Sequence, residues 1–554
     1  MNILRYAARY ARGTVLWAVV FGTVGGALTA WIVALVGETL RTGVGTSTQM
    51  LTFAALAVAG CVLRFASSDL MTRFSQRHML GMSQDLTRRV VDSGLRNVEE
   101  VGSARLLATL TEDIALITTT IAAMPIVVAN LAVVVACFLY VAYISWFAFA
   151  LASASVVVAV CSYVMVPRRG TAVLAKARDD RDAVMDHYNA LTDGFSELKL
   201  HRARRLAFLS RTLHASLATI ARLNRKGLTL YNIASNYNQL MFFGIVGVIV
   251  FGTPRWTSVD PAAMTSAVLA LLYGRGPLEV VVNAVPTMAR AEVALQKYDD
   301  VISRLPREHE AYDSVPAFPP CREVQLRDVE YTYAGDDGRR FGLGPIDLTL
   351  RAGEILFVTG GNGSGKTTLA KIIAGLYMPT SGQVRLDGEL VTSANRDQYR
   401  QLISAVFAKF HLFRELLGVE RATIDCEAGD WLARMRLDQR VEIHGGKFSD
   451  LNLSTGQRKR LALLVAMLEN RQICIFDEWA ADQDAEYREQ FYLHLLPELK
   501  ARDKMVIVIS HDDRYYAYGD RLIKLDQGKI VLDEDLDASA ALRAAGVMQV
   551  AGGL

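Results

Sequence analysis

The glycine-rich stretch GGNGSGKTT, which begins at Gly360, has the residue types and spacing of a phosphate-binding loop. Gly360, four further residues and then Gly365, Lys366 and Thr367 fit the pattern GxxxxGK[ST], between the apolar run ILFVT and the helical pattern KTTLAKIIA. Glycines let backbone N–H groups turn toward phosphate oxygens, and a helix N-terminus adds partial positive charge. We expect Lys366 to reach the β and γ phosphates of ATP, and the Thr367 hydroxyl to ligate Mg²⁺.

Two adjacent carboxylates, Asp477 and Glu478, end a second apolar run, CIFDE. An aspartate there can join the Mg²⁺ ligands, and the next residue is a candidate general base for the attacking water. In-line attack on a γ-phosphate needs mainly positioning and charge stabilisation. A third apolar run, VIVIS, is followed by His511.

These residues lie in a half of the chain where short β-rich runs alternate with helical patterns. The runs EILFVTG, ICIFDE and VIVIS predict an α/β domain with a largely parallel sheet. Just ahead, the polar stretch SRLPREHEAYDSVPAFPP contains four prolines and is typical of a linker. We expect a linker over residues 301–321 and a nucleotide-binding domain over residues 322–554.

The first half is built from long uncharged runs. Thr14 to Val36 carries no charge over 23 residues, and a helix of that length, about 35 Å, crosses a bilayer. Further runs end near Leu63, cover residues 114–167, cover residues 236–253 and begin near Ala262. The 54 residues from 114 to 167 exceed one span, and we divide them near Ser145 and Trp146. The sequence therefore predicts an all-α transmembrane domain of six helices over residues 1–300.

The basic residues orient these spans. The segment after the second span contains Arg64, Arg73, Arg77, Arg88, Arg89, Arg96 and Arg105, and the segment after the fourth contains Arg168, Arg169, Lys176, Arg202, Arg204, Arg205, Arg222 and Lys226. The opposite side offers Arg41 and Arg255. By the positive-inside rule, the N-terminus, both long loops and the C-terminal domain are cytoplasmic. The loops have helical periodicity, so we expect them to extend the membrane helices.

Overall charge and cysteine usage exclude other classes of protein. The net charge of +3 gives no strong attraction to nucleic acid, and we expect no nucleic-acid partner. The six cysteines are scattered, without a CxxC pair. We therefore expect neither a disulfide framework nor a zinc site.

Further motifs give the chain a family resemblance. LSTGQ, at Leu453 to Gln457, matches the LSGGQ signature of ATP-binding cassettes except for Thr455, and the C-terminal domain as a whole resembles such a cassette. The six spans ahead of it resemble the membrane half of an ABC exporter. The stretches GFSELKL, YRQLISAVFAKFHLF and NLSTGQRKRLALL are similar to those of bacterial half-transporters for cyclic peptides and peptide siderophores, such as the pyoverdine exporters.

The resemblance implies a set of nucleotide-site residues. Tyr333, in VEYTY, occupies the place where such cassettes stack an aromatic ring on adenine. Residues implied to bind the nucleotide are Gly360, Gly361, Asn362, Gly363, Ser364, Gly365, Lys366, Thr367, Thr368, Ser454, Thr455, Gly456, Gln457 and Asp484. Thr367 and Asp477 are implied to hold Mg²⁺, and Glu478, His511 and Lys366 to be catalytic.

The sequence departs from the family pattern in two places. Most cassettes have a glutamine after the strand that corresponds to residues 403–407, where it touches Mg²⁺ and relays to the membrane domain; here Ala408 and Lys409 follow that strand. The D-loop, usually SALD, reads Ala481-Asp482-Gln483-Asp484, and its last residue alone matches. Both departures leave the base in place, so we still expect hydrolysis.

The resemblance also implies a dimer and a transport cycle. Family members bind ATP between the P-loop of one cassette and the signature of another, so one chain cannot complete a site; the intact motifs favour a homodimer over a heterodimer. ATP then closes the cassettes, the long loops carry that motion to the spans, and hydrolysis reopens them. We expect an inner-membrane exporter of a peptide-like or siderophore-like solute. An importer of siderophores, a general lipid or drug exporter and a non-transporting regulator are the alternatives; with no cysteine-protease domain before the first span, we do not expect a leader-trimming exporter.

The sixth span is interrupted by charge, in LLYGRGPLEVVVNAV. Arg275 and Glu279 lie four residues apart and so share a helix face. Charges at membrane depth usually face a cavity or each other. Two interpretations stay open: an internal ion pair beside a kink, or a solute cavity lined by this face together with Asn283 and with Asn236 and Gln239 of the fifth span.

Overall fold

The computed structural model describes residues 12–42, 45–158, 184–252, 261–306, 321–334, 340–419 and 424–536. The chain divides into two compact units. The first comprises Met1–Leu86 and Ala104–Val301, and the second comprises Thr87–Ser103 and Ile302–Leu554. The second unit therefore includes a short segment, residues 87–103, from the predicted loop after the second span.

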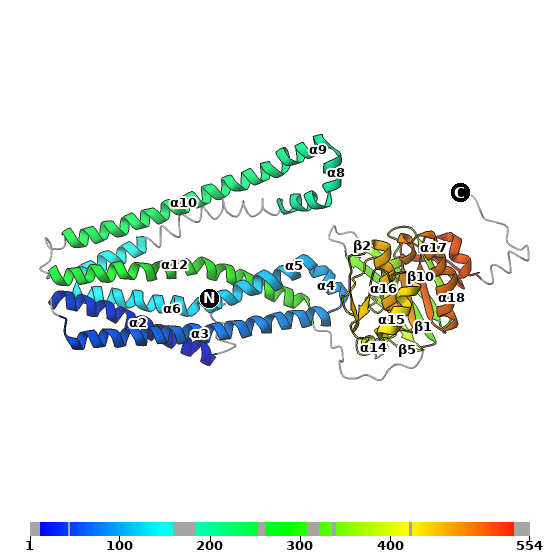
Figure 1. Ribbon diagram of the computed structural model, residues 1–554, viewed down its shortest axis with the longest axis horizontal. Coiled ribbons are helices and arrows are strands. Elements are labelled where there is room, and N and C mark those ends of the chain that lie inside the picture. Colours follow the sequence, from blue (N-terminus) through cyan, green and yellow to red (C-terminus); the bar gives the residue numbers. More distant parts are fainter. Residues whose placement is uncertain are drawn as a thin grey trace, which may run out of the picture. The chain divides into compact units, whose positions relative to one another are not determined.

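The first unit is helical (Figure 1). Its elements are α2 (Arg12–Thr42), α3 (Ser47–Asp92), α5 (Ser103–Ala108), the π-helical turn η1 (Thr109–Asp113), α6 (Ile114–Ile144), the helix Trp146–Val158, α8 (Phe195–Leu200), α9 (Arg202–Ala207), the π-helical turns η2 (Phe208–Leu213) and η3 (Val248–Gly252), α10 (His214–Gly247) and α12 (Pro261–Arg304). Both α3 and α12 extend beyond the first unit. The 46 residues of α3 make a helix of about 69 Å, more than twice the thickness of a bilayer core.

Six apolar helices lie where the sequence predicts spans. Among the described residues, four helical segments are long and apolar enough to cross a membrane: Gly13–Thr39, Ser47–Asp92, Ser103–Ile144 and Ala263–Arg304. Two shorter apolar helices, Trp146–Val158 and Gln239–Gly252, coincide with the predicted fourth and fifth spans. α6 ends at Ile144 and the next helix begins at Trp146, so the break falls at the predicted place.

Small residues bring α2, α3, α6 and α12 side by side (Figure 1). A Cβ at Gly26 would lie 2.4 Å from the Ala129 carbonyl oxygen, so α2 and α6 touch through a backbone that tolerates no side chain there. Ser67 Oγ donates to the Ala18 carbonyl at 2.5 Å, and Ser266 Oγ donates to the Gly37 carbonyl at 2.9 Å. These bonds satisfy polar groups that membrane lipid could not satisfy.

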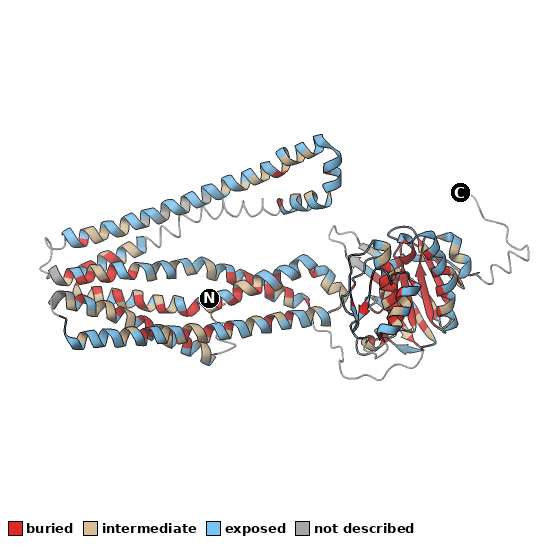
Figure 2. Ribbon diagram, in the orientation of Figure 1, coloured by how far each residue is buried: buried red, intermediate tan, exposed pale blue. Residues whose placement is uncertain are grey.

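The second unit is an α/β domain with two main sheets and buried strands (Figure 2). The first sheet is antiparallel, in the order β2-β1-β4-β5, and contains β1 (Glu323–Ala334), β2 (Arg340–Arg351), β4 (Ser381–Leu386) and β5 (Glu389–Leu390). The second has the order β12-β11-β3-β10-β9-β6, with β3 (Ile355–Gly360), β6 (Ile403–Val406), β9 (Ile473–Asp477), β10 (Met505–Ile509), β11 (Arg521–Asp526) and β12 (Lys529–Asp535). Its strands are parallel apart from β12. A short hairpin pairs β7 (Ile443–His444) with β8 (Lys447–Phe448).

Helices cover these sheets. They are α4 (Leu95–Val101), α13 (Lys366–Ile373), α14 (Arg396–Arg400), α15 (Ile424–Arg434), α16 (Thr455–Glu469), α17 (Ala485–Glu489) and α18 (Leu496–Ala501), with the turns η4 (Trp479–Asp482), η5 (Gln490–Leu495) and η6 (Asp513–Tyr518). β3, β9 and β10 form the centre of the parallel sheet and are almost fully buried. The fold class predicted from the sequence, a helical transmembrane domain followed by an α/β cassette, is the observed one. The predicted linker falls mostly outside the described residues, although α12 reaches Arg304.

Candidate nucleotide-binding site

Four loops that carry predicted site residues meet at one edge of the parallel sheet. The P-loop follows β3, Glu478 follows β9, His511 follows β10, and Ala408 follows β6. Because β6, β9, β10 and β3 are neighbouring parallel strands, their carboxyl ends lie together. Ligands of open α/β sheets bind at this edge.

The P-loop forms a cradle of left-handed glycines ahead of α13. Gly360, Gly363 and Gly365 have φ values of 147°, 78° and 105°, which a side chain rarely tolerates. Lys366 is buried, and its Nζ donates to the carbonyls of Gly360 at 2.8 Å and Gly361 at 2.9 Å. Burial lowers the pKa of Lys366, while the carboxylates of Glu478 and Asp477 oppose that shift. The loop therefore encloses the lysine, and the carboxylates at the end of β9 favour its charged form.

An unpaired hydroxyl inside this loop fits a phosphate ligand. Ser364 Oγ is buried without a hydrogen-bond partner among the described residues. A Cβ at Gly360 would meet that oxygen at 2.7 Å, whereas Gly361 and Gly363 face open space. Buried hydroxyls without a partner are costly, and a phosphate oxygen would supply one. Asn362 and Thr367 are exposed in the loop and Thr368 is half-buried.

The predicted metal ligands lie together. Thr367 Oγ1 donates to Asp477 Oδ2 at 3.0 Å. Burial raises the pKa of the Asp477 carboxyl, against hydrogen bonds from Thr367 and from the backbone N–H of Ala408. Among the described residues, no group of three or more His, Cys, Asp or Glu side chains could hold a metal alone. A hydroxyl, a carboxylate and phosphate oxygens suit Mg²⁺, which binds through few protein ligands in nucleotide sites.

The predicted base and the predicted histidine face each other. His511 Nε2 lies 3.4 Å from Glu478 Oε1, and both side chains are partly exposed. Glu478 adopts the left-handed conformation, with φ 52° and ψ 32°, and its N–H donates to the Ile509 carbonyl at 3.0 Å. A cavity of about 290 Å³ lies beside the pair and is also lined by Arg488, Ser510 and Asp512. This space admits water next to the carboxylate.

The signature motif forms the N-terminus of α16. Ser454 is the N-cap: its Oγ accepts from the Gln457 N–H at 3.3 Å, and the Gln457 side chain accepts from the Ser454 N–H at 3.0 Å. Ser454 and Thr455 are exposed and Gly456 is half-exposed. Since α16 has 15 residues, its exposed N-terminus has the dipole and the free N–H groups that bind a phosphate.

Two further predicted residues are placed differently. The Asp484 carboxylate accepts from the Tyr487 N–H at 3.1 Å and caps α17, so its side chain already has a local partner. Tyr333 belongs to β1 and pairs with Phe341 in the antiparallel sheet, but its side chain lies outside the described residues.

Sequence reasoning missed three parts of this site. Lys459 is buried next to Glu478, Arg488 donates to the Gln483 carbonyl at 3.0 Å, and the Ala408 N–H reaches Asp477. Lys459 and Arg488 belong to no known phosphate-binding motif. The signal that could have found Lys459 is a positive charge on the apolar side of α16, a place that needs a partner.

The polar residues of the membrane half are only partly brought together. Arg275 Nε lies 3.2 Å from Glu279 Oε1, and the guanidinium lies 5.6 Å from the ring centroids of Phe242 and Phe243 on α10. Arg275 therefore joins α12 to the fifth span through aromatic rings. Asn236 and Gln239 on α10 are exposed, and so is Asn283 on α12. The Asn236 side chain donates to the Asn232 carbonyl on its own helix.

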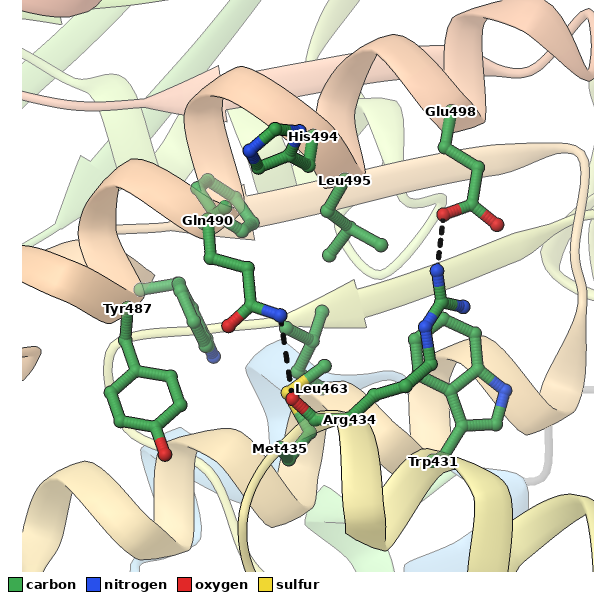
Figure 3. Close-up of a pocket in the computed structure, with 11 residues that line it drawn as sticks. Trp431, Arg434, Met435, Leu463, Tyr487, Gln490, His494, Leu495 and Glu498 are labelled. Atoms are coloured by element: carbon green, nitrogen blue, oxygen red, sulfur yellow. Dashed lines mark hydrogen bonds and ion pairs between the residues drawn. The ribbon is translucent and has the colours of Figure 1, made fainter.

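A separate crevice in the cassette contains none of the predicted residues (Figure 3). It is lined by aromatic side chains of α15, η4, α17 and η5, including Trp431, Trp479 and Phe491. Its rim carries an ion pair between Arg434 and Glu498 at 2.8 Å. The volume of about 40 Å³ is too small for a nucleotide.

Comparison with known proteins agrees with this geometry. Residues 343–481 match the family described as ABC transporter. The chain is 34% identical over 525 residues to the ATP-binding protein SyrD of Pseudomonas syringae pv. syringae, an alignment that covers 92% of this chain and 93% of SyrD. It is 30% identical to the macrolide export ATP-binding/permease protein MacB of Shigella boydii serotype 4 (strain Sb227), but over only 38% of this chain and 34% of MacB.

The fold of the whole chain also has a solved counterpart. A bacterial Atm1-family ABC exporter with ATP bound superimposes with a TM-score of 0.72, and the match covers 98% of this chain and 99% of that one at 16% identity. The match therefore includes the helical unit as well as the cassette. The chain belongs to the ABC transporter family, as a multi-pass, exporter-type half-transporter whose cassette binds and hydrolyses ATP to drive transport.

Proposed function

We propose that this half-transporter exports a peptide-like or siderophore-like solute across the bacterial inner membrane as a homodimer. The observation that carries the proposal is the nucleotide site: a P-loop, the candidate Mg²⁺ ligands Thr367 and Asp477 and the Glu478–His511 pair occur on one chain together with a signature motif. Similarity to the ATP-binding protein SyrD over nearly the full length, and the fold shared with an Atm1-family ABC exporter, support this proposal. The proposed domains are residues 1–300, 301–321 and 322–554, with the N-terminus and the cassette cytoplasmic.

The residues of the cassette have distinct tasks in hydrolysis. Backbone N–H groups from Gly361 to Thr367 bind the phosphates, and Lys366 stabilises charge on the β and γ phosphates. Thr367 and Asp477 would hold Mg²⁺, which would supply positive charge to neutralise the phosphate oxygens. Glu478 takes the proton of the attacking water, and His511, 3.4 Å from that carboxylate, orients it.

Each chain contributes one half of each of the two composite ATP sites. Its P-loop, Glu478 and His511 serve its own ATP, whereas Ser454 and Gly456 at the exposed N-terminus of α16 serve the ATP of a second subunit. Two identical chains would form two equal sites. Tyr333 stacks on adenine, and Asp484, the N-cap of α17, contributes from the end of the D-loop.

The segment 87–103 offers a route from cassette to membrane half that does not use the missing glutamine. Glu99 of α4 pairs with Lys371 Nζ at 2.9 Å and accepts from the Tyr377 hydroxyl. Lys371 belongs to α13, the helix that begins at the P-loop. The helix α13 therefore connects the phosphate-binding loop to α4. α4 follows α3 after a short turn.

The polar face of α12 is the proposed solute contact. Arg275, Glu279 and Asn283, with Asn236 and Gln239 of α10, offer charge and amide groups to a polar peptide-like solute. The contact of Arg275 with Phe242 and Phe243 adds aromatic surface of the kind that peptide side chains pack on. Uptake of siderophores on the same fold is the second candidate, because the polar face would serve either direction.

Transport direction decides between the two candidates. The purified protein would be reconstituted in sealed vesicles with cassettes outside, and ATP would be added with a fluorescent cyclic peptide or a hydroxamate peptide siderophore. Export predicts ATP-dependent accumulation inside these vesicles, with none for Glu478→Gln. Loss of preloaded solute from the same vesicles would identify an importer and contradict the proposal.

A further inference from the structure

Lys459 is a buried cation with two short contacts near the catalytic edge. Its side chain is 5% exposed, and Nζ lies 2.7 Å from the Glu478 carbonyl oxygen and 2.7 Å from Asp482 Oδ2. A buried ammonium is tolerated only where its charge and its donors are matched. Here the D-loop supplies the charge through Asp482, one of the residues that depart from the usual SALD.

The peptide that Lys459 contacts is strained. Glu478 has φ 52°, a conformation that non-glycine residues adopt rarely. Strained residues persist at functional sites where surrounding contacts over-determine them. Three contacts do so here: the Glu478 N–H donates to Ile509, Lys459 Nζ donates to the Glu478 carbonyl, and Trp479 Nε1 donates to the Lys459 carbonyl at 2.7 Å.

The same lysine belongs to the signature helix. Lys459 lies on α16, one helical turn after Gly456. A second contact runs parallel to the first: the buried Gln483 side chain donates through Nε2 to the Gly456 carbonyl at 3.1 Å. The fit is close, because a Cβ at Gly456 would lie 2.8 Å from the Asp482 carbonyl oxygen. Two side-chain contacts therefore join the signature to the D-loop.

From this geometry we infer that Lys459 is a positioning residue that links the two ATP sites of the dimer. It holds the turn that aims Glu478 at the subunit's own ATP, and through the Asp482 and Gln483 contacts it ties that turn to the signature facing the partner's ATP. ATP that binds against the signature in one composite site therefore positions Glu478 in the other composite site. The inference rests on the proposed dimer with composite sites.

The test is Lys459→Met, which keeps the unbranched shape and most of the length of the buried side chain and removes the charge. Asp482 remains hydrated because about half of it is exposed. We expect kcat to fall at least tenfold, the Kd for ATP to stay within twofold, and the Hill coefficient of ATPase against ATP concentration to fall toward 1. Lys459→Arg, which retains charge and donors, should keep the Hill coefficient of the wild-type protein. Lys447→Met is the matched control, because Lys447 forms an exposed pair with Glu415 at 2.8 Å.

The outcomes separate the inference from the proposed function. A merely structural lysine would lower kcat or the melting temperature and leave the Hill coefficient unchanged; that result overturns the inference, as does a wild-type kcat. Gln483→Ala provides a variant that keeps the buried pair, and it should lower the Hill coefficient by a smaller amount. If Glu478→Gln still hydrolyses ATP, the proposed site itself is wrong, whatever Lys459→Met does.

Discussion

The nucleotide site and the polar face of α12 differ in how firmly the chain fixes them. Lys366 is 7% exposed and Asp477 is 1% exposed, and each is bonded to neighbours in its own unit. In the α12 pair, the side chains of Arg275 and Glu279 are 29% and 61% exposed. Chemistry at a phosphate needs fixed distances, whereas a solute cavity needs accessible groups. The nucleotide site can be tested with ATP alone, whereas the polar face of α12 must be tested by measuring solute transport.

The largest expected effect is at the base. Glu478→Gln keeps the shape of the side chain but cannot take a proton from water, and general bases contribute about 10²–10⁴-fold to rate. ATPase activity should fall by that order while ATP affinity is retained, so that the dimer stays closed. Steady-state ATPase and ATP binding by the purified protein measure both. A wild-type rate would refute the assignment.

Lys366→Ala should act on binding. A hydrogen bond to a charged group contributes about 1.5–3 kcal/mol, which corresponds to about a 10- to 150-fold rise in the Kd for ATP. Equilibrium binding of a fluorescent ATP analogue measures it. Lys500→Ala, at an exposed pair with Asp520, is the control and should leave the Kd unchanged. An unaltered Kd for Lys366→Ala would show that Lys366 does not bind the phosphates.

A smaller effect is expected at the adenine. Stacking of an aromatic ring contributes about 0.5–1.5 kcal/mol beyond area burial. Tyr333→Ala should therefore raise the Kd for ATP several-fold, and Tyr333→Phe should not. Equal effects of the two substitutions would assign the contact to the hydroxyl instead of the ring.

The smallest effect on the cassette is expected from the swap Arg275→Glu with Glu279→Arg. Basal ATPase should stay within about twofold, because a cation–π contact at such a site contributes about 0.5–1 kcal/mol. Solute-stimulated ATPase and vesicle transport should be lost if this face binds the solute. The matched control is the swap of Asp69 and Arg73 on α3, another i,i+4 pair. Wild-type transport by the Arg275/Glu279 swap would sink the cavity hypothesis.

The sequence predicts those features that depend on residues close together in the chain. The P-loop, the strand-end carboxylates and the apolar spans are contiguous patterns, so residues such as Lys366 and Asp477 could be named with their tasks. The antiparallel sheet was not predicted, because the partners of β1 are set by tertiary pairing across many residues. Lys459 was missed for the same reason: Asp482 is 23 residues further along the chain.

Departures from the family pattern became interpretable only in three dimensions. Ala408 lacks the amide of a glutamine, yet its backbone N–H reaches Asp477, a contact available to any residue there except proline. Asp482 in the D-loop is explained by the lysine that it neutralises. A substitution that breaks a motif can thus be compensated by a contact that the motif does not describe.

The two prolines inside α12 give this helix an unusual mechanical character. Pro277 and Pro286 are nine residues apart, and at about 100° per residue they project from opposite faces. A proline in a helix interior removes a backbone hydrogen bond and favours a bend away from its ring. Two bends of opposite sense leave the ends of a rod parallel but offset, as in a crank. Bending at both prolines would therefore shift one end of α12 sideways while the two ends keep the same direction.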